Sequence, residues 1–97
     1  MIVHLVLFRF RPGFDRDHVR VRALHQQMGQ LPQRIPQIRA WEHGFNLTAD
    51  AQAWDYALRG TFATEADLHA YFEHSAHLPL LAEWEAVADL AFVDFAS

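Results

Sequence analysis

The segment from Ile2 to Arg11 constrains the fold most, because it alternates as a β-strand does while both of its faces are apolar over most of their length. One face would carry Ile2, His4, Val6, Phe8 and Phe10, and the other Val3, Leu5, Leu7, Arg9 and Arg11. A strand of this kind is typically buried on both sides. Any fold for this chain must therefore cover both faces of its first strand.

A helix is predicted after the turn signal Pro12-Gly13. Asp15 or Asp17 can cap it, and Pro32 and Pro36 should end it at about Leu31 and force an extended crossing. Its buried stripe is predicted to hold Val19, Ala23, Leu24, Met28 and Leu31.

Two strands follow, over residues 38–47 and 53–62, joined by a short polar turn and therefore antiparallel. Gly44 suggests a bulge or a close backbone approach, and Gly60 either a bulge or space for a ligand.

The remaining chain predicts two helices and a last strand. Thr64 begins a capping box for a helix that runs to about Glu73. Ser75 can cap the next helix, whose first turn tolerates Pro79, and residues 90–95 form the strand. The second of these helices should bury Leu80, Leu81, Trp84 and Val87.

The order βαββαβ predicts one α+β domain, residues 1–97, with the ferredoxin-like arrangement of a four-stranded antiparallel sheet and both helices on one face. The other sheet face is then bare, although the first strand is apolar there as well. A second copy of the chain is the simplest cover, since most oligomers are homomeric, so we expect a homodimer through the open sheet face. A hydrophobic fraction of 52% fits such a partner surface.

Composition excludes several kinds of chemistry. The chain has no cysteine and no lysine, so thiolate catalysis and lysine Schiff bases are ruled out. A net charge of −4 with scattered arginines argues against nucleic acid as a partner. No apolar run is long enough for a membrane span and no signal peptide is evident, so we expect a cytoplasmic protein without a membrane partner. Seven histidines make imidazole the natural source of chemistry.

Several local patterns, in order along almost the whole chain, resemble the stress-responsive A/B barrel (Dabb) family of dimeric α+β barrels. They are His4-Leu5-Val6-Leu7-Phe8-Arg9-Phe10, Leu31-Pro32 with Ile35-Pro36-Gln37-Ile38, Glu42-His43-Gly44-Phe45-Asn46, Asp55-Tyr56-Ala57-Leu58, Tyr71-Phe72-Glu73-His74-Ser75-Ala76-His77 and Phe92-Val93-Asp94-Phe95. The family usually has proline at the position of Ser75, and either residue suits a helix start.

The resemblance implies a possible site as well as a fold. One plant subgroup looks like a polyketide cyclase that performs an intramolecular aldol closure without a cofactor. Its catalytic Tyr and His match Tyr71 and His77, and its supporting His and Asp match His4 and Asp94. Where that subgroup has a third-strand His, this chain has Tyr56, which weakens any transfer of the specific substrate. Related α+β barrels include small monooxygenases acting on aromatic substrates, and haem-binding enzymes.

Strand alternation singles out His4, Tyr56 and Asp94 independently, because each is a polar residue on an otherwise apolar strand face. Tyr56 would share its face with Trp54, Leu58, Gly60 and Phe62. The three polar groups either satisfy one another in a structural network or line a pocket. Asp94 would orient the His4 imidazole in both cases.

Tyr71 and His77 flank the break between the two later helices, and each is either a packed core residue or part of a site. His74 and His77, with His4, could in principle bind a metal, although the spacing is loose and we expect none. The other histidines, His18, His25, His43 and His69, are interpreted as exposed.

Three functions remain open. The first is a cofactor-independent, cyclase-like or lyase-like enzyme in which His77 is the general base and Tyr71 polarises the carbonyl of a small apolar compound. The second is a non-catalytic, stress-associated binding or structural dimer, and the third a small monooxygenase-like enzyme on aromatic substrates. A solvent-connected cavity touching His4, Tyr71 and His77 would favour the enzyme, and a filled core with mutual hydrogen bonds the binding protein.

Overall fold

The computed structural model describes all residues, 1–97, and has the predicted order of elements, including two separate helices between the third and fourth strands. The elements are β1 (Ile2–Phe10), α1 (Val19–Arg34), β2 (Ala40–Phe45), β3 (Tyr56–Phe62), α2 (Glu65–Glu73), α3 (Leu78–Val87) and β4 (Ala88–Ala96). The ferredoxin-like βαββαβ topology is therefore confirmed. None of the three helices combines the length and the apolar character needed to cross a bilayer.

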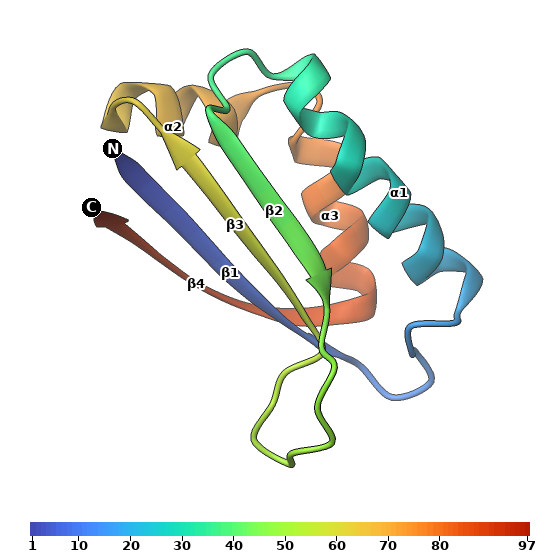
Figure 1. Ribbon diagram of the computed structural model, residues 1–97. Coiled ribbons are helices and arrows are strands. Elements are labelled where there is room, and N and C mark those ends of the chain that lie inside the picture. Colours follow the sequence, from blue (N-terminus) through green and yellow to red (C-terminus); the bar gives the residue numbers. More distant parts are fainter.

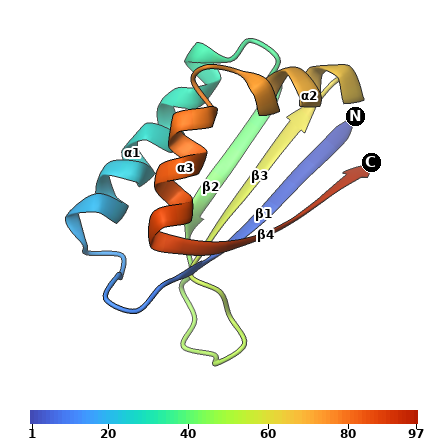
Figure 2. The ribbon, with the colours of Figure 1, turned by 180° about the vertical axis from the view of Figure 1, so that it is seen from behind.

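The four strands form one antiparallel sheet in the order β2-β3-β1-β4. The helices lie together on one face of it, and the loop between β2 and β3 projects beyond the sheet (Figures 1 and 2). The register places His4 of β1 between Gly60 of β3 and Asp94 of β4. The pairing thus places His4, near the N-terminus, beside Asp94, near the C-terminus.

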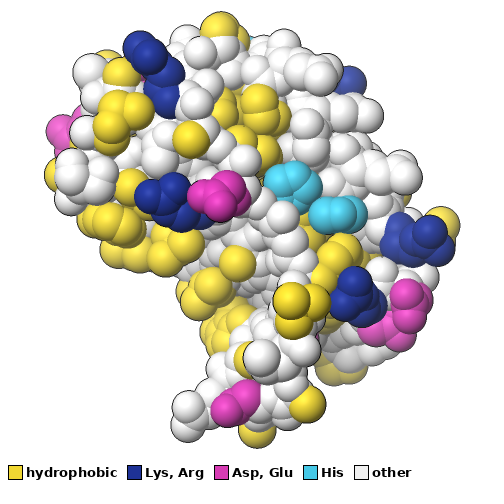
Figure 3. Space-filling view, viewed as in Figure 1, with side chains coloured by type: hydrophobic (Ala, Val, Ile, Leu, Met, Phe, Trp, Pro, Cys, Tyr) yellow, Lys and Arg dark blue, Asp and Glu magenta, His cyan; other side chains and the backbone are white.

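The core lies between the sheet and the helices. From β1 it takes Val6 and Phe8, and from α1 it takes Leu24 and Met28. The opposite face of the sheet has no covering layer (Figure 1), and hydrophobic side chains are visible along the side where β1 and β4 lie (Figure 3). Leu7 and the outer side chains of β4 are among the exposed large hydrophobic residues. The prediction that both faces of β1 are apolar therefore holds, but on the helix-free face a single chain buries Val3 and leaves Leu7 exposed.

Pro32 does not end α1, contrary to the sequence prediction, and the helix continues to Arg34. A proline inside a helix cannot donate to the carbonyl four residues earlier, which here belongs to Met28. The indole Nε1 of Trp41 donates to that oxygen at 2.8 Å. The tertiary structure thus supplies the hydrogen bond that proline removes, and it ties β2 to α1 in doing so.

The start of α1 was also predicted wrongly. The N-cap is His18, whose Nδ1 accepts from the backbone N–H of Arg20, rather than Asp15 or Asp17. The buried stripe begins at Val21, while Val19 and Ala23 are exposed. The buried positions 21, 24, 28 and 31 follow the alternating three- and four-residue spacing of a helix face, and residues 19 and 23 fall outside it.

Neither strand glycine marks a bulge. Gly44 pairs regularly with Ala57, and nothing lies within 4 Å of where its Cβ would be. Gly60 instead gives room to Trp41, since a Cβ at residue 60 would lie 3.0 Å from the indole ring. Both strands are shorter than predicted, and Trp54 precedes β3, where Arg9 stacks over its ring at 4.6 Å.

The helix break after Glu73 is confirmed, but its cap differs from the prediction. Thr64 caps α2 as expected, accepting from the backbone N–H of Asp67. The N-cap of α3 is His77 rather than Ser75, and it makes no side-chain capping bond. The His77 ring is therefore free to turn toward the sheet. α3 buries Leu80, Trp84 and Val87 as predicted, whereas Leu81 is half-buried.

Candidate functional site

An apolar cavity of about 250 Å³ lies between the sheet and the helices. Twelve of its fourteen lining residues are hydrophobic, and the other two are histidines. The lining consists of His4, Val6, Phe8, Met28, Leu31, Leu58, Tyr71, Phe72, His77, Leu80, Leu81, Trp84, Leu90 and Phe92. An apolar chamber with a few convergent polar groups is the usual form of a small-molecule site.

His4 is held in the cavity wall by Asp94. The two residues are paired across β1 and β4, and Nδ1 of the imidazole lies 2.5 Å from a carboxylate oxygen. The His4 side chain is almost fully buried, whereas the carboxylate keeps about a quarter of its surface exposed. A carboxylate accepts hydrogen bonds, so the Nδ1 of His4 donates and its Nε2 is left for another partner.

Tyr71 and His77 lie at the break between α2 and α3, with ring centroids 4.3 Å apart. The Nδ1 of His77 donates to the Phe72 carbonyl at 3.0 Å, because a carbonyl can only accept. That bond fixes the tautomer, so the unprotonated nitrogen of the neutral ring is Nε2.

Burial shifts the titration of both residues. Desolvation lowers the pKa of His77, the hydrogen bond to Phe72 opposes this shift, and the nearby His4 and His74 add to it. Burial also raises the pKa of Tyr71, and the negative charge of Asp94 raises it further. At neutral pH, His77 is therefore a neutral base and Tyr71 a protonated donor.

These side chains form one group. The ring of His4 lies 5.7 Å from that of Tyr71 and 5.3 Å from that of Phe72, centroid to centroid. Of the five residues predicted to form the site, the structure brings together His4, Tyr71, His77 and Asp94.

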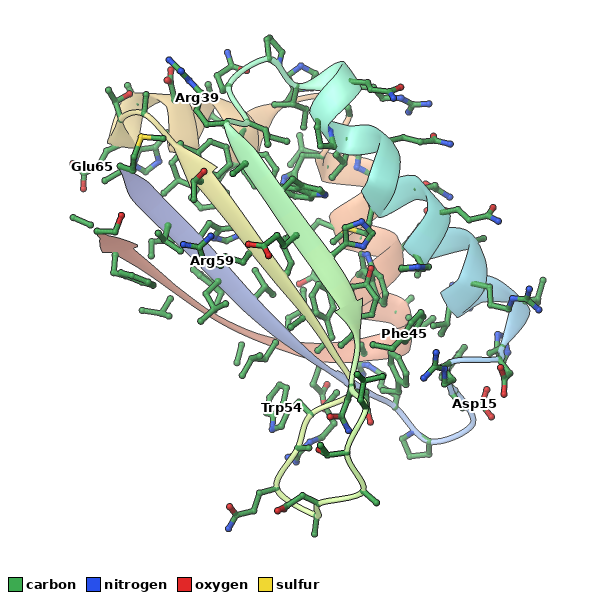
Figure 4. The ribbon with its side chains drawn as sticks, viewed as in Figure 1. Asp15, Arg39, Phe45, Trp54, Arg59 and Glu65 are labelled. Atoms are coloured by element: carbon green, nitrogen blue, oxygen red, sulfur yellow. The ribbon has the colours of Figure 1, made fainter.

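Tyr56 does not join them. It is absent from the cavity lining, and its hydroxyl contacts His25 Nδ1 at 2.8 Å and His43 Nδ1 at 2.6 Å. Phe45, which points from the end of β2 toward the start of α1 in Figure 4, packs on the rings of His25 and Tyr56. A single hydroxyl thus links α1, β2 and β3 beside the cavity.

This second polar cluster was missed because its two histidines were interpreted as exposed. His25 and His43 are half-buried, with ring centroids 5.1 Å apart. Two neighbouring histidine side chains reach the surface on the side of the molecule shown in Figure 3. Burial lowers the pKa of His43, and His25 contributes to the shift. The only sequence signal was Tyr56 itself, a phenol on an apolar strand face that needs a partner for its hydroxyl.

The histidines do not assemble into a metal centre. His74 Nδ1 accepts from the backbone N–H of Ala76, and His4 and His77 each donate through Nδ1 within the protein. No group of three or more His, Cys, Asp or Glu side chains is arranged to hold an ion.

Fold and cavity together define a small ferredoxin-like protein with an apolar chamber between its sheet and its helices. The chain belongs to the family of the stress responsive A/B barrel domain, whose model matches residues 2–97.

Known relatives agree with this assignment. An uncharacterized protein of Streptomyces coelicolor is 34% identical over 95 residues, which cover 98% of each chain. A dimeric ferredoxin-like protein of unknown function from Thermobifida fusca is 28% identical, with a TM-score of 0.87 over 99% of this chain and 90% of the other. A hydroxynitrile lyase from Passiflora edulis is 18% identical, with a TM-score of 0.83 over 97% of this chain and 90% of the other, and it shares the fold alone.

Proposed function

We propose that this protein is a homodimer whose cavity binds a small apolar carbonyl compound and acts on it by acid–base chemistry, without a cofactor. The observation that carries the proposal is the convergence of His4, Tyr71 and His77 on one apolar cavity. A filled core in which these residues satisfied only one another would have argued against it.

In this proposal His77 is the general base. Its Nδ1 is engaged by the Phe72 carbonyl, which leaves the lone pair on Nε2, and its lowered pKa keeps the ring neutral at pH 7. Nε2 would remove a proton from the carbon next to the substrate carbonyl, and the C–H electron pair would become the enolate. The protonated histidine then returns the proton to that carbon, or gives it to a substrate oxygen that has gained negative charge.

Tyr71 would stabilise the negative charge that develops on the carbonyl oxygen. Tyr71 lines the cavity, and its raised pKa keeps the hydroxyl protonated and able to donate. A donor placed in an apolar site stabilises an enolate more strongly than water does, because the effective dielectric constant is low. His4, oriented by Asp94, would support the same region of the substrate.

A non-catalytic binding protein is the second candidate, and one observation favours it. Both His4 and His77 already hydrogen-bond within the chain, as structural histidines do. The two candidates differ in whether a bound ketone loses its α-protons.

The homodimer is proposed from the uncovered sheet face. Leu7, Val93 and Phe95 are exposed large hydrophobic residues on that side, and the Thermobifida fusca relative is a dimer. Leu5→Asp would place a charge among them and should dissociate or unfold the protein. A monomeric mass for the wild type at micromolar concentration, measured by light scattering, would refute the dimer.

The experiment for the activity follows hydrogen–deuterium exchange at the α-carbon of 4-phenylbutan-2-one by NMR in D₂O. We expect the protein to accelerate exchange and His77→Gln to abolish the acceleration, since general base catalysis contributes about 10²–10⁴-fold. Tyr71→Phe should reduce it strongly. Tyr56→Phe is the matched control, because it removes a phenol hydroxyl outside the cavity. Ligand-induced thermal stabilisation without exchange would support the binding protein instead.

A further inference from the structure

The strand that closes one side of the cavity is itself poorly covered. β4 contributes Leu90 and Phe92 to the lining and carries Asp94, which holds His4. It pairs only with β1 and forms the edge of the sheet (Figure 2). Two parts of the candidate site therefore depend on a strand held by a single neighbour.

Exposure along β4 is continuous and includes both faces. Every residue from 91 to 97 is exposed, and Phe92, Val93 and Phe95 keep 66%, 52% and 45% of their surface accessible. A long apolar edge strand at a chain terminus tends to fray or to attach to another chain. The single chain thus leaves this wall of the cavity without the packing that would fix it.

The outer face of β4 indicates what covers it. Val93 and Phe95 pair with Leu5 and Val3 of β1, so these side chains form one apolar strip on the helix-free side of the sheet. Val3 is already buried in the single chain, and the exposed part of the strip is Val93 and Phe95. Figure 4 shows Arg59 of β3 on that same face, and its guanidinium is paired with Glu42 at 3.2 Å. That ion pair forms within one chain, so these two charges already have each other as partners, and the strip itself offers a second copy only apolar side chains. An apolar strip meeting its own copy is self-complementary.

We propose that a second copy of the chain, packed on this strip, completes the cavity by holding β4 in place, so that ligand binding is coupled to dimerisation. The inference rests on the proposed function for the ligand and on the proposed dimer for the partner. Contact with the partner keeps Val93 and Phe95 against β1. Their neighbours Phe92 and Asp94, which point to the other face, then stay against the cavity and His4. By linkage, each ligand bound in a cavity strengthens the dimer by the same factor by which dimerisation tightens the binding of that ligand.

The test compares the wild type with Val93→Asp, which charges the outer strip without touching the cavity lining. Val93→Thr is the matched control, with the same branched shape and no charge. Binding of 4-phenylbutan-2-one and the downfield imidazole proton on Nδ1 of His4 are both measured by NMR. We expect Val93→Asp to be monomeric, to bind the ketone at least about tenfold more weakly and to lose the Nδ1 proton signal to solvent exchange, while Val93→Thr resembles the wild type.

Dilution of the wild type through its dimer dissociation gives the same comparison if Val93→Asp fails to fold. Equal ketone affinity and an unchanged His4 signal in monomer and dimer would overturn the inference, and so would a wild type that is monomeric at every concentration. If the dimer binds no ketone while the monomer still loses the His4 signal, the proposed function fails and the coupling of β4 to the dimer stands.

Discussion

The hydrogen bond from Trp41 to the Met28 carbonyl offers a sharp test of how α1 tolerates Pro32. Trp41→Phe keeps an aromatic ring against Gly60 but removes the Nε1 donor. The Met28 carbonyl then has neither the indole nor a backbone N–H at residue 32, because proline has none. Stranding a buried carbonyl costs about 1–3 kcal/mol, which for a domain of this size lowers the melting temperature by about 4 to 20 °C.

Pro32→Ala supplies the missing donor and makes the argument a double-mutant cycle. In the wild type the new N–H gives the Met28 oxygen a second donor, whereas in Trp41→Phe it gives that oxygen its only one. We therefore expect Pro32→Ala to be more favourable in the Trp41→Phe background by about 1 kcal/mol. The effect of proline on the unfolded chain is the same in both backgrounds and cancels.

Urea denaturation of the four proteins at one fixed protein concentration measures the cycle, because the stability of an oligomer depends on concentration. Equal effects of Pro32→Ala in the two backgrounds would show that the indole does not replace the proline's missing hydrogen bond. A loss with Trp41→Phe that Pro32→Ala does not reduce would point to lost ring packing instead.

Three further outcomes are expected. Burial depresses the folded-state pKa of His77 and His43, so the stability they contribute is present above the unfolded pKa of about 6.5 and is lost as the pH falls below it. The melting temperature should therefore decline toward pH 5, and less steeply in His43→Gln. An equal slope in the variant and the wild type would contradict a depressed pKa for His43. Asp94→Ala should destabilise the protein by about 1–3 kcal/mol by leaving His4 Nδ1 without its acceptor, with Asp94→Asn losing less in urea denaturation because its amide oxygen still accepts. Deleting residues 90–97 should abolish soluble expression, because it removes β4 from its ladder with β1, and a truncated protein with an unchanged circular dichroism spectrum would refute this.

The sequence alone determined the order of the elements and the faces of the strands. Alternation in residues 2–11 is a local property of the backbone, so it placed His4 with Val6 and Phe8 before any tertiary contact was known. Strand alternation also singled out Asp94 as a polar residue that could orient His4, and the helix break beside His77 followed from its local pattern. The positions of Tyr71 and His77 as a candidate pair came from the family resemblance.

Only the tertiary structure decided where Pro32 and Tyr56 find their partners. A helix breaker is tolerated when a distant indole replaces its hydrogen bond, and no local pattern around residue 32 records Trp41. The Tyr56 hydroxyl likewise turns from the cavity to His25 and His43, which lie 31 and 13 residues away in the chain. Propensity and periodicity describe a segment by itself, whereas these choices depend on which buried polar atoms meet across the fold, and the cost of leaving such atoms unpaired makes those meetings decisive.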